Sequence, residues 1–238
     1  MGGLRTIGIL GGMGPEATIL LQRKLIEAVP ARDDSDHVPL LVDMNPQVPS
    51  RIAHLIEGGE VDPGPTLAKM AERLEAAGAA ALAMPCNTAH HYAPAIRAAA
   101  SVPFLDMVAL ASDHAATRLG AGGRVGILAS PAVQMTGLYE AALGAGGLGT
   151  LWPDDGAPML AAIRAIKADG VGEDARAAVA AAADELTGRG AGLLLVACTE
   201  FSMIADRLTP AVPVVDTLDI LVGEIVAFAQ APNPTEVP

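Results

Sequence analysis

Short aliphatic runs alternate with amphipathic segments along this chain. Residues 6–10 (TIGIL) are typical of a buried strand, and residues 17–26 (ATILLQRKLI) place their apolar side chains on one helical face. Residues 217–229, near the other end, show the same helical periodicity. Aliphatic strands that alternate with helices predict an α/β fold in which parallel sheets are buried between helices.

Two distant segments of the chain align without a gap, and each ends in a cysteine. They are residues 74–86 (LEAAGAAALAMPC) and 186–198 (LTGRGAGLLLVAC). In both, a helical pattern stops at a glycine eight residues before the cysteine, Gly78 or Gly190, and an aliphatic strand follows. We therefore expect each cysteine at the carboxyl end of a strand.

Two more pairs of segments repeat in the same order. Residues 7–10 (IGIL) resemble 125–128 (VGIL), and residues 102–106 (VPFLD) resemble 212–216 (VPVVD). The separations are 118 residues (125 minus 7), 112 (198 minus 86) and 110 (213 minus 103). Single matches between alanine-rich units could arise from composition alone, but three pairs in one order predict a duplicated α/β unit.

The duplication predicts two similar α/β domains related by a pseudo-twofold axis, each with a parallel-type sheet. Asp106 and Asp216 follow matched strands and mark crossovers between them. We expect a first domain of residues 1–105 plus 217–238 and a second of residues 106–216. Because open α/β sheets bind ligands at the carboxyl ends of their strands, facing domains would bring both cysteines to one cleft.

Composition and charge narrow the possible partners. The chain has 238 residues, of which 51% are hydrophobic and 18% charged, as in a globular protein. The net charge of −12 argues against nucleic acid and against an anionic membrane surface. No apolar run approaches a membrane span, and residues 1–5 leave no room for a signal peptide, so we expect a cytoplasmic protein with reduced thiols. Residues 230–238 are expected to form a frayed tail.

Two thiols that face each other across a carbon acid can work as a pair of bases. One removes a proton, and the other returns a proton to the opposite face, which inverts the configuration. A thiol suits this task because its reference pKa of about 8.5 is close to neutrality. A lone buried cysteine is more often a small hydrophobic core residue, but the repeat relation between Cys86 and Cys198 favours a two-base racemase or epimerase.

Several segments also resemble a known family. Residues 9–18 (ILGGMGPEAT), 84–91 (MPCNTAHH) and 197–201 (ACTEF) are similar to the signature segments of the aspartate/glutamate racemase superfamily, in particular its aspartate racemase branch. The similarity extends over residues 45–51 (NPQVPSR) and 163–170 (IRAIKADG). It implies a cofactor-independent amino-acid racemase acting on a small acidic amino acid, first of all aspartate. We also expect a homodimer.

The resemblance implies a role for each matching residue. Cys86 and Cys198 would be the acid/base residues, with Cys198 serving the L-enantiomer and Cys86 the D-enantiomer. The residues that would donate hydrogen bonds to the α-carboxylate are Asn87, Thr88 and Thr199. The residues that would bind the side-chain carboxylate are Arg51 and Lys167. Met13 would line the pocket with the glycine loop, and Gly12, Asn45 and Gln47 would support the site.

Some roles stay open at this stage. Glu200 could activate Cys198, hold the substrate ammonium or cap a helix. Ser50 stands where an Asp commonly precedes the arginine in aspartate racemases, so glutamate or a broader range of amino acids is an alternative substrate. A related isomerase or decarboxylase of the superfamily is a further alternative, and a non-catalytic ligand-binding module is the other class.

The glycine loop also permits a nucleotide interpretation, because Gly12, Gly14 and Ala17 match the loose dinucleotide fingerprint. Glu16 argues against it, since an acid in the first helical turn repels a pyrophosphate, and the acidic residue expected about 20 residues further on is missing. We interpret the glycines as a close-approach surface whose amides reach a carboxylate. No metal is expected, and His90 and His91 are predicted to be surface or capping residues.

Overall fold

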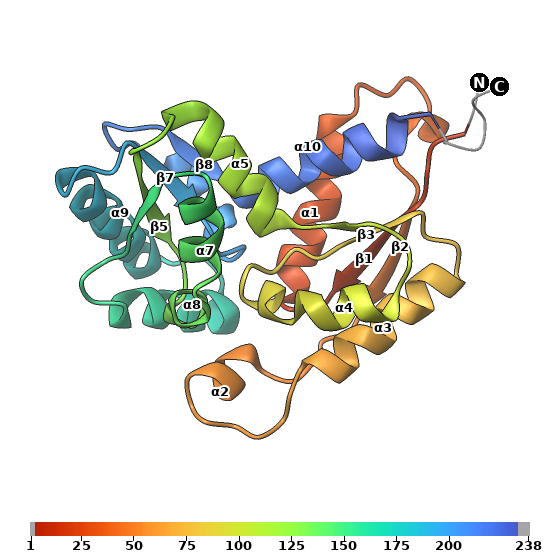
Figure 1. The fold of residues 1–238 in the computed structure, drawn as a ribbon, viewed down its shortest axis with the longest axis horizontal. Helices are drawn as coiled ribbons and strands as arrows, with labels where there is room; N and C mark the ends of the chain where they lie inside the picture. Colours follow the sequence, from red (N-terminus) through yellow and green to blue (C-terminus); the bar gives the residue numbers. More distant parts are fainter. Residues whose placement is uncertain (1–2, 233–238) are drawn as a thin grey trace.

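The computed structural model describes residues 3–232 and contains two four-stranded parallel sheets (Figure 1). The first has the order β2-β1-β3-β4 and consists of β1 (Ile7–Gly11), β2 (Leu40–Met44), β3 (Ala81–Ala83) and β4 (Phe104–Leu105). The second has the order β6-β5-β7-β8 and consists of β5 (Arg124–Leu128), β6 (Gly149–Leu151), β7 (Leu193–Val196) and β8 (Val214–Asp216). Each half thus repeats one strand order, which confirms the predicted α/β fold and its duplication.

Helices follow most strands. In the first half these are α1 (Pro15–Ala28), α2 (Arg51–Leu55), α3 (Gly64–Ala76) and α4 (Ala93–Ala99), with 3-10 turns η1 (Asp34–Asp36) and η2 (Thr88–Tyr92). In the second half they are α5 (Met107–Leu119), α6 (Pro131–Thr136), α7 (Leu138–Ala145), α8 (Ala157–Asp169) and α9 (Glu173–Gly188), with η3 (Phe201–Met203), η4 (Ala205–Arg207) and the final helix α10 (Thr217–Gln230). Most of the predicted frayed tail, residues 233–238, lies outside the described residues.

Two glycines end matched helices in the same way. Gly78 after α3 and Gly190 after α9 have φ of +100° and +89°, a region that side chains disfavour. In both copies the following amide bonds, at 3.0 Å, to the carbonyl of the buried leucine five residues back. These are Schellman caps, and they turn the chain directly into β3 or β7 as the sequence predicted.

The faces of the two sheets are covered by helices, and two of these helices are exchanged between the halves. The first sheet packs against α3 and α4 on one face and α1 and α10 on the other. The second packs against α8 and α9 on one face and α5 and α7 on the other. Although α5 follows β4 of the first sheet, it covers the second sheet, and α10 returns to the first.

Each exchanged helix begins at one of the predicted crossover residues. The Asp106 carboxylate accepts from two amides of the first turn of α5, and that of Asp216 accepts from Leu218 in α10. The crossovers are therefore confirmed, whereas the exact division of the chain into domains stays a prediction. In the described part of the chain, no helix has the length and apolar character needed to cross a bilayer.

Candidate active site

Cys86 and Cys198 line the same small cavity, with a volume of about 40 Å³. The loops after β3 and β7 carry them there, and each residue is only 7% exposed. Both halves supply the rest of the lining: Met13, Ser50, Arg51, Ile52, Thr88, Ser130, Ile163, Lys167 and Glu200. The structure therefore brings the two thiols together with five other predicted site residues, namely Met13, Arg51, Thr88, Lys167 and Glu200.

A second pocket of about 690 Å³ adjoins the first and shares four lining residues with it: Ser50, Arg51, Lys167 and Glu200. The predicted residues Gly12 and Gln47 line this outer pocket. Asn45 instead shapes its wall, since its Oδ1 accepts a hydrogen bond of 3.0 Å from the Gln47 amide. The inner cavity thus holds the thiols, and the cationic side chains lie where the two pockets meet.

The Cys198 thiol faces a carboxylate. Its Sγ donates to Glu200 Oε2 at 3.1 Å, and Glu200 Oε1 forms an ion pair of 3.1 Å with Lys167 Nζ. Burial raises the pKa of Cys198 well above its ordinary value, and the negative Glu200 raises it further, while Lys167 opposes the shift. Cys198 is therefore a protonated thiol at neutral pH with a proton acceptor beside it.

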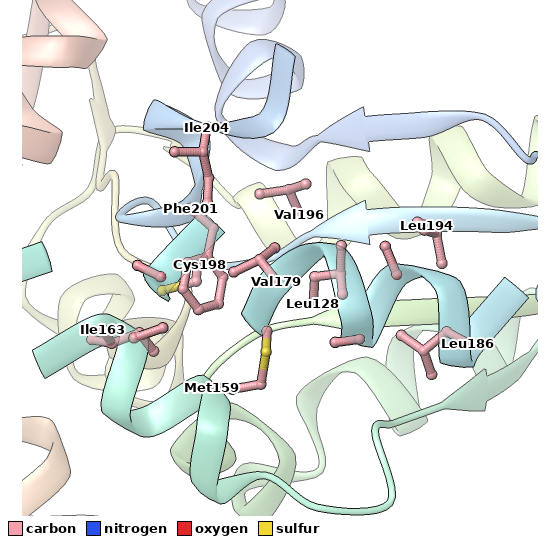
Figure 2. Packing of buried hydrophobic residues seen from close by; sticks show 14 of the residues in the cluster. Leu128, Met159, Ile163, Val179, Leu186, Leu194, Val196, Cys198, Phe201 and Ile204 are labelled. Atoms are coloured by element: carbon pink, nitrogen blue, oxygen red, sulfur yellow. The ribbon is translucent and has the colours of Figure 1, made fainter. Parts of the chain in front are cut away.

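Cys198 lies at the edge of a tightly packed core (Figure 2). It sits beside the ring of Phe201, near Ile163, in a cluster built from β5, β7, α8 and α9. Glu200 precedes η3, but its side chain makes no capping hydrogen bond. The capping interpretation of Glu200 is therefore wrong, because its carboxylate turns towards the thiol and Lys167 instead.

The Cys86 loop is held by a buried histidine. His90 Nδ1 lies 2.8 Å from the Cys86 carbonyl, and Nε2 accepts from the Met107 amide at 3.1 Å, at the start of α5. Burial lowers the pKa of His90, so the ring is neutral with its proton on Nδ1. The predicted surface position is wrong for His90, while the capping alternative is confirmed, and His91 is exposed. Residues 3–232 contain no group of three His, Cys, Asp or Glu side chains arranged to share a metal ion.

The three residues predicted to donate hydrogen bonds to the substrate α-carboxylate differ in the contacts they make within the protein. Thr88 lines the inner cavity. The Asn87 carboxamide accepts from the Tyr139 hydroxyl at 2.6 Å and donates to Thr217 Oγ1 at 3.1 Å, which leaves one amide N–H without a partner among residues 3–232. Thr199, like Asn87, is buried. Their contact with a substrate stays a prediction.

Arg51 is anchored by backbone carbonyls and retains free donors. Nη1 lies 3.4 and 3.0 Å from the carbonyls of Val48 and Pro49, and Nη2 lies 3.3 Å from that of Met13. Within the described chain, Nε is buried without a hydrogen-bond partner. Of the five guanidinium N–H groups, the one on Nε and one on Nη2 have no partner among residues 3–232. Two such donors suit a carboxylate bound through both oxygens.

The glycine loop packs mainly against the protein itself. The Gly12 amide donates to Thr18 Oγ1 at 3.0 Å, so the expectation that this amide binds a ligand is wrong. A Cβ on Gly12 would lie 2.4 Å from the backbone of Asn45, and one on Gly11 would lie 2.6 Å from Thr18. Pro15 does begin α1, as predicted. The glycines therefore let the loop lie tightly against the start of α1 and the β2 loop.

Sequence reasoning missed several cavity residues. Ser130 follows β5, at the position that the repeat matches to Gly12 (130 minus 12 is 118), so the repeat could have identified it. Its hydroxyl accepts from the Ala132 amide at 3.0 Å and caps α6. Ile52 and Ile163 give the cavity apolar walls, and no motif singles them out.

Comparison with known proteins places the chain among racemases. A sequence model described as Asp/Glu/Hydantoin racemase matches residues 10–225. The "Broad specificity amino-acid racemase RacX" of Bacillus subtilis (strain 168) is 27% identical over 219 residues, which cover 89% of this chain and 92% of the relative.

Solved structures agree in fold. The chain superposes on the Picrophilus torridus aspartate racemase with a TM-score of 0.85 and 28% identity, covering 98% of this chain and 97% of that one. It superposes on the glutamate racemase isoform RacE1 from Bacillus anthracis with a TM-score of 0.64 and 19% identity, covering 96% and 82% of the two chains. The duplicated fold, the two thiols in one cavity and the family match over most of the chain lead to one assignment: the protein is an isomerase that belongs to the Asp/Glu/hydantoin racemase family.

Proposed function

We propose that this protein is an amino-acid racemase that needs no cofactor and uses Cys86 and Cys198 as its two bases. The observation that carries the proposal is the single cavity lined by both thiols. The two residues come from matched positions of the two halves, so a ligand between them would meet one sulfur on each side. Aspartate is the substrate that we favour.

The proposed reaction moves one proton off the α-carbon and another onto it. A thiolate removes the α-proton, and the C–H electron pair spreads into the α-carboxylate. The opposite thiol then donates its proton to the other face, so the product is inverted and the two sulfurs have exchanged protonation states. In this proposal Glu200 takes the thiol proton and prepares Cys198 as the base, which the distance of 3.1 Å between its Oε2 and Cys198 Sγ supports.

The carbanion needs fixed donors where its charge develops, because the α-proton is only weakly acidic. Thr88 and the remaining N–H of Asn87 support this role, together with Thr199. Removing one such donor from comparable anion sites costs about 3–4 kcal/mol of transition-state stabilisation. Asn87 need not move during the reaction, since Tyr139 and Thr217 already hold its side chain.

Two N–H groups of Arg51 that have no partner among the described residues support binding of a distal carboxylate. The ammonium group of Lys167 has three N–H donors and could contact the same carboxylate beside its ion pair with Glu200, which would couple substrate binding to the environment of Cys198. Ser50 in place of an acid and the outer pocket of about 690 Å³ support the alternatives, a glutamate racemase or a racemase of broad specificity. A cytoplasmic location and a homodimer remain predictions.

Chiral chromatography tests the proposal. The purified protein, without added cofactor, is incubated with each enantiomer of aspartate, glutamate and alanine. We expect aspartate to be racemised fastest, and Arg51→Met to lower its kcat/KM by about 10- to 150-fold while changing alanine turnover far less. Equal losses would show that Arg51 does not select the side chain. Amino acids that all stay unracemised would contradict the proposal and favour a related isomerase, a decarboxylase or a binding module.

A further inference from the structure

A buried chain of hydrogen bonds connects the surroundings of the two thiols. Tyr139 in α7 donates to Asn87 Oδ1 at 2.6 Å, Asn87 Nδ2 donates to Thr217 Oγ1 at 3.1 Å, and that hydroxyl donates to the Val196 carbonyl at 2.9 Å. Asn87 is the neighbour of Cys86, and Val196 lies two residues before Cys198. The chain therefore crosses between the halves and contacts both cysteine segments.

The hydrogen bonds assign one orientation to each group in this network, and the Thr217 hydroxyl also interacts with that of Tyr139. Burial raises the pKa of Tyr139, so its phenol stays protonated and acts as the donor. The Asn87 oxygen must then face Tyr139 and its nitrogen Thr217, while Thr217 accepts from Asn87 and donates to Val196. Tyr139 and Thr217 are fully buried and Asn87 is 2% exposed, so water does not compete for these bonds. A buried network of polar side chains that hydrogen-bond to one another restricts their motion.

This hydrogen-bond network has no counterpart at the positions that the repeat matches to Asn87 and Thr217. The repeat matches Asn87 to Thr199 (199 minus 87 is 112) and Thr217 to Met107 (217 minus 107 is 110). A methionine at the matched position offers no hydroxyl, and Met107 instead uses its amide to reach His90. The duplicated fold therefore does not require these hydrogen bonds. This indicates that they have a role specific to the contact between the two halves beside the thiols.

We propose that Tyr139 and Thr217 are positioning residues. They hold Asn87, and with it the neighbouring Cys86, so that the Cys86 sulfur stays aligned with that of Cys198. The inference rests on the proposed two-base reaction. Racemisation needs both sulfurs aligned on one carbon, whereas exchange of the α-proton on one face needs a single thiol. Loss of the network therefore impairs racemisation more than one-sided exchange.

The test uses Tyr139→Phe and Thr217→Val, with Thr217→Ser as the variant that keeps the hydroxyl. Ser112→Ala is the matched control, because Ser112 is also buried but donates only to Val108 within α5. Racemisation of aspartate and one-sided exchange in deuterated water are measured for each protein, with urea unfolding alongside. We expect racemisation to fall about tenfold in the first two variants, since small misplacements at a reacting centre are costly. Exchange should change by less than about threefold, and Thr217→Ser and Ser112→Ala should behave as the parent.

A second readout needs no catalysis. One equivalent of Hg²⁺ can bridge two aligned thiolates, forming two Hg–S bonds as two thiol protons leave, and the chain has no other cysteine. We expect retention of the bridged ion against a competing dithiol, followed by mass spectrometry, to fall about tenfold in Tyr139→Phe and Thr217→Val. A parental ratio of racemisation to exchange together with parental Hg²⁺ retention would overturn the inference. A parent protein that retains Hg²⁺ but racemises no amino acid would overturn the proposed function instead. Loss of Hg²⁺ retention in the two variants would then still support the role of Tyr139 and Thr217 in aligning the two thiols.

Discussion

The two halves share their backbone design but differ in the polar groups around each thiol. In the first half, the neutral His90 binds the Cys86 carbonyl, and Arg97 lies 2.6 Å from the capping residue Asp106. In the second half, Ser202, which the repeat matches to His90 (202 minus 90 is 112), donates to Asp216 at 2.8 Å. Lys24, which comes from α1 of the first half, lies 3.9 Å from the other Asp216 oxygen. The duplication thus preserved caps and strand order while the charges diverged.

The divergence changes how matched acids ionise. Burial raises the pKa of Asp216 to about 6, because the hydrogen bonds from Leu218 and Ser202 compensate only in part. Burial acts on Asp106 as well, but there the Ala109 amide and the Arg97 guanidinium stabilise the carboxylate and hold its pKa below the ordinary value. The two matched acids therefore ionise over different ranges of pH.

The largest expected effect on stability tests a feature that the halves share, the close packing around a glycine in β1 and in β5. A Cβ on Gly8 in β1 would lie 2.9 Å from the Cβ of Ala79, while one on Gly126 in β5 would lie 2.5 Å from the movable Leu194 Cδ2. We expect Gly8→Ala to lower the free energy of unfolding by about 2–3 kcal/mol and Gly126→Ala by about 1–2 kcal/mol, measured by urea unfolding. Gly144→Ala in α7, where the described chain leaves the added Cβ open space, should be neutral or slightly stabilising. Unchanged stability in Gly8→Ala would contradict this packing.

A smaller effect is expected from the two capping acids, Asp216 and Asp106, which should change the free energy of unfolding with pH in different ways. Because the folded-state pKa of Asp216 is raised, its stabilising contribution is complete below the unfolded value of 3.8 and is lost as the pH rises through about 6. The free energy of unfolding should fall by about 1–2 kcal/mol between pH 5 and pH 8 through this group. Asp216→Asn should abolish that part of the pH dependence.

In the matched variant Asp106→Asn, the pH dependence of stability should change in the opposite direction. A lowered pKa means that Asp106 stabilises the fold above its unfolded value, so the variant should be less stable at both pH 5 and pH 8. Parallel urea titrations of both variants and the parent check this. If Asp216→Asn and Asp106→Asn show the same pH dependence, the electrostatic difference between the halves is wrong.

The finest difference concerns the Cys198 thiol. In a Cys86→Ala background, Glu200→Gln removes the negative charge that raises the Cys198 pKa and releases Lys167 to act on the thiolate. We expect the midpoint of its pH-dependent alkylation by iodoacetamide to move to lower pH. Glu57→Gln, which breaks an exposed ion pair of 2.9 Å with Arg164, should leave the midpoint in place. A midpoint that stays or rises in Glu200→Gln would refute the proposed influence of Glu200.

The sequence predicted the repeat because each of its elements has a local signal. A glycine that stops a helix, an aliphatic run and a proline at a helix start can all be read within a few residues, as at Gly78, Gly190 and Pro15. Cys86 and Cys198 emerged through those signals. His90 was misjudged because its partners, the Cys86 carbonyl and the Met107 amide, are backbone groups that no side-chain pattern reveals.

Hydrogen bonds between side chains that are distant in sequence could not be predicted from such local patterns. Tyr139 lies 52 residues from Asn87 and Thr217 lies 130 residues from it, and no local pattern connects either of them to Asn87. The Gly12 amide was expected to face a ligand, because nothing near it in sequence indicates that Thr18 turns back to accept its hydrogen bond. Such partners are fixed only when the halves and their connecting helices pack together.

The most direct test of the two-base account follows deuterium into aspartate. In deuterated water, the parent should convert each enantiomer into inverted product that carries deuterium at the α-carbon. Cys86→Ala and Cys198→Ala should both lose racemisation, and we expect Cys86→Ala to retain exchange of L-aspartate and Cys198→Ala that of D-aspartate. A Cys86→Ala protein that racemises aspartate at the parental rate would contradict the account, because Cys198 is then the only thiol in the chain.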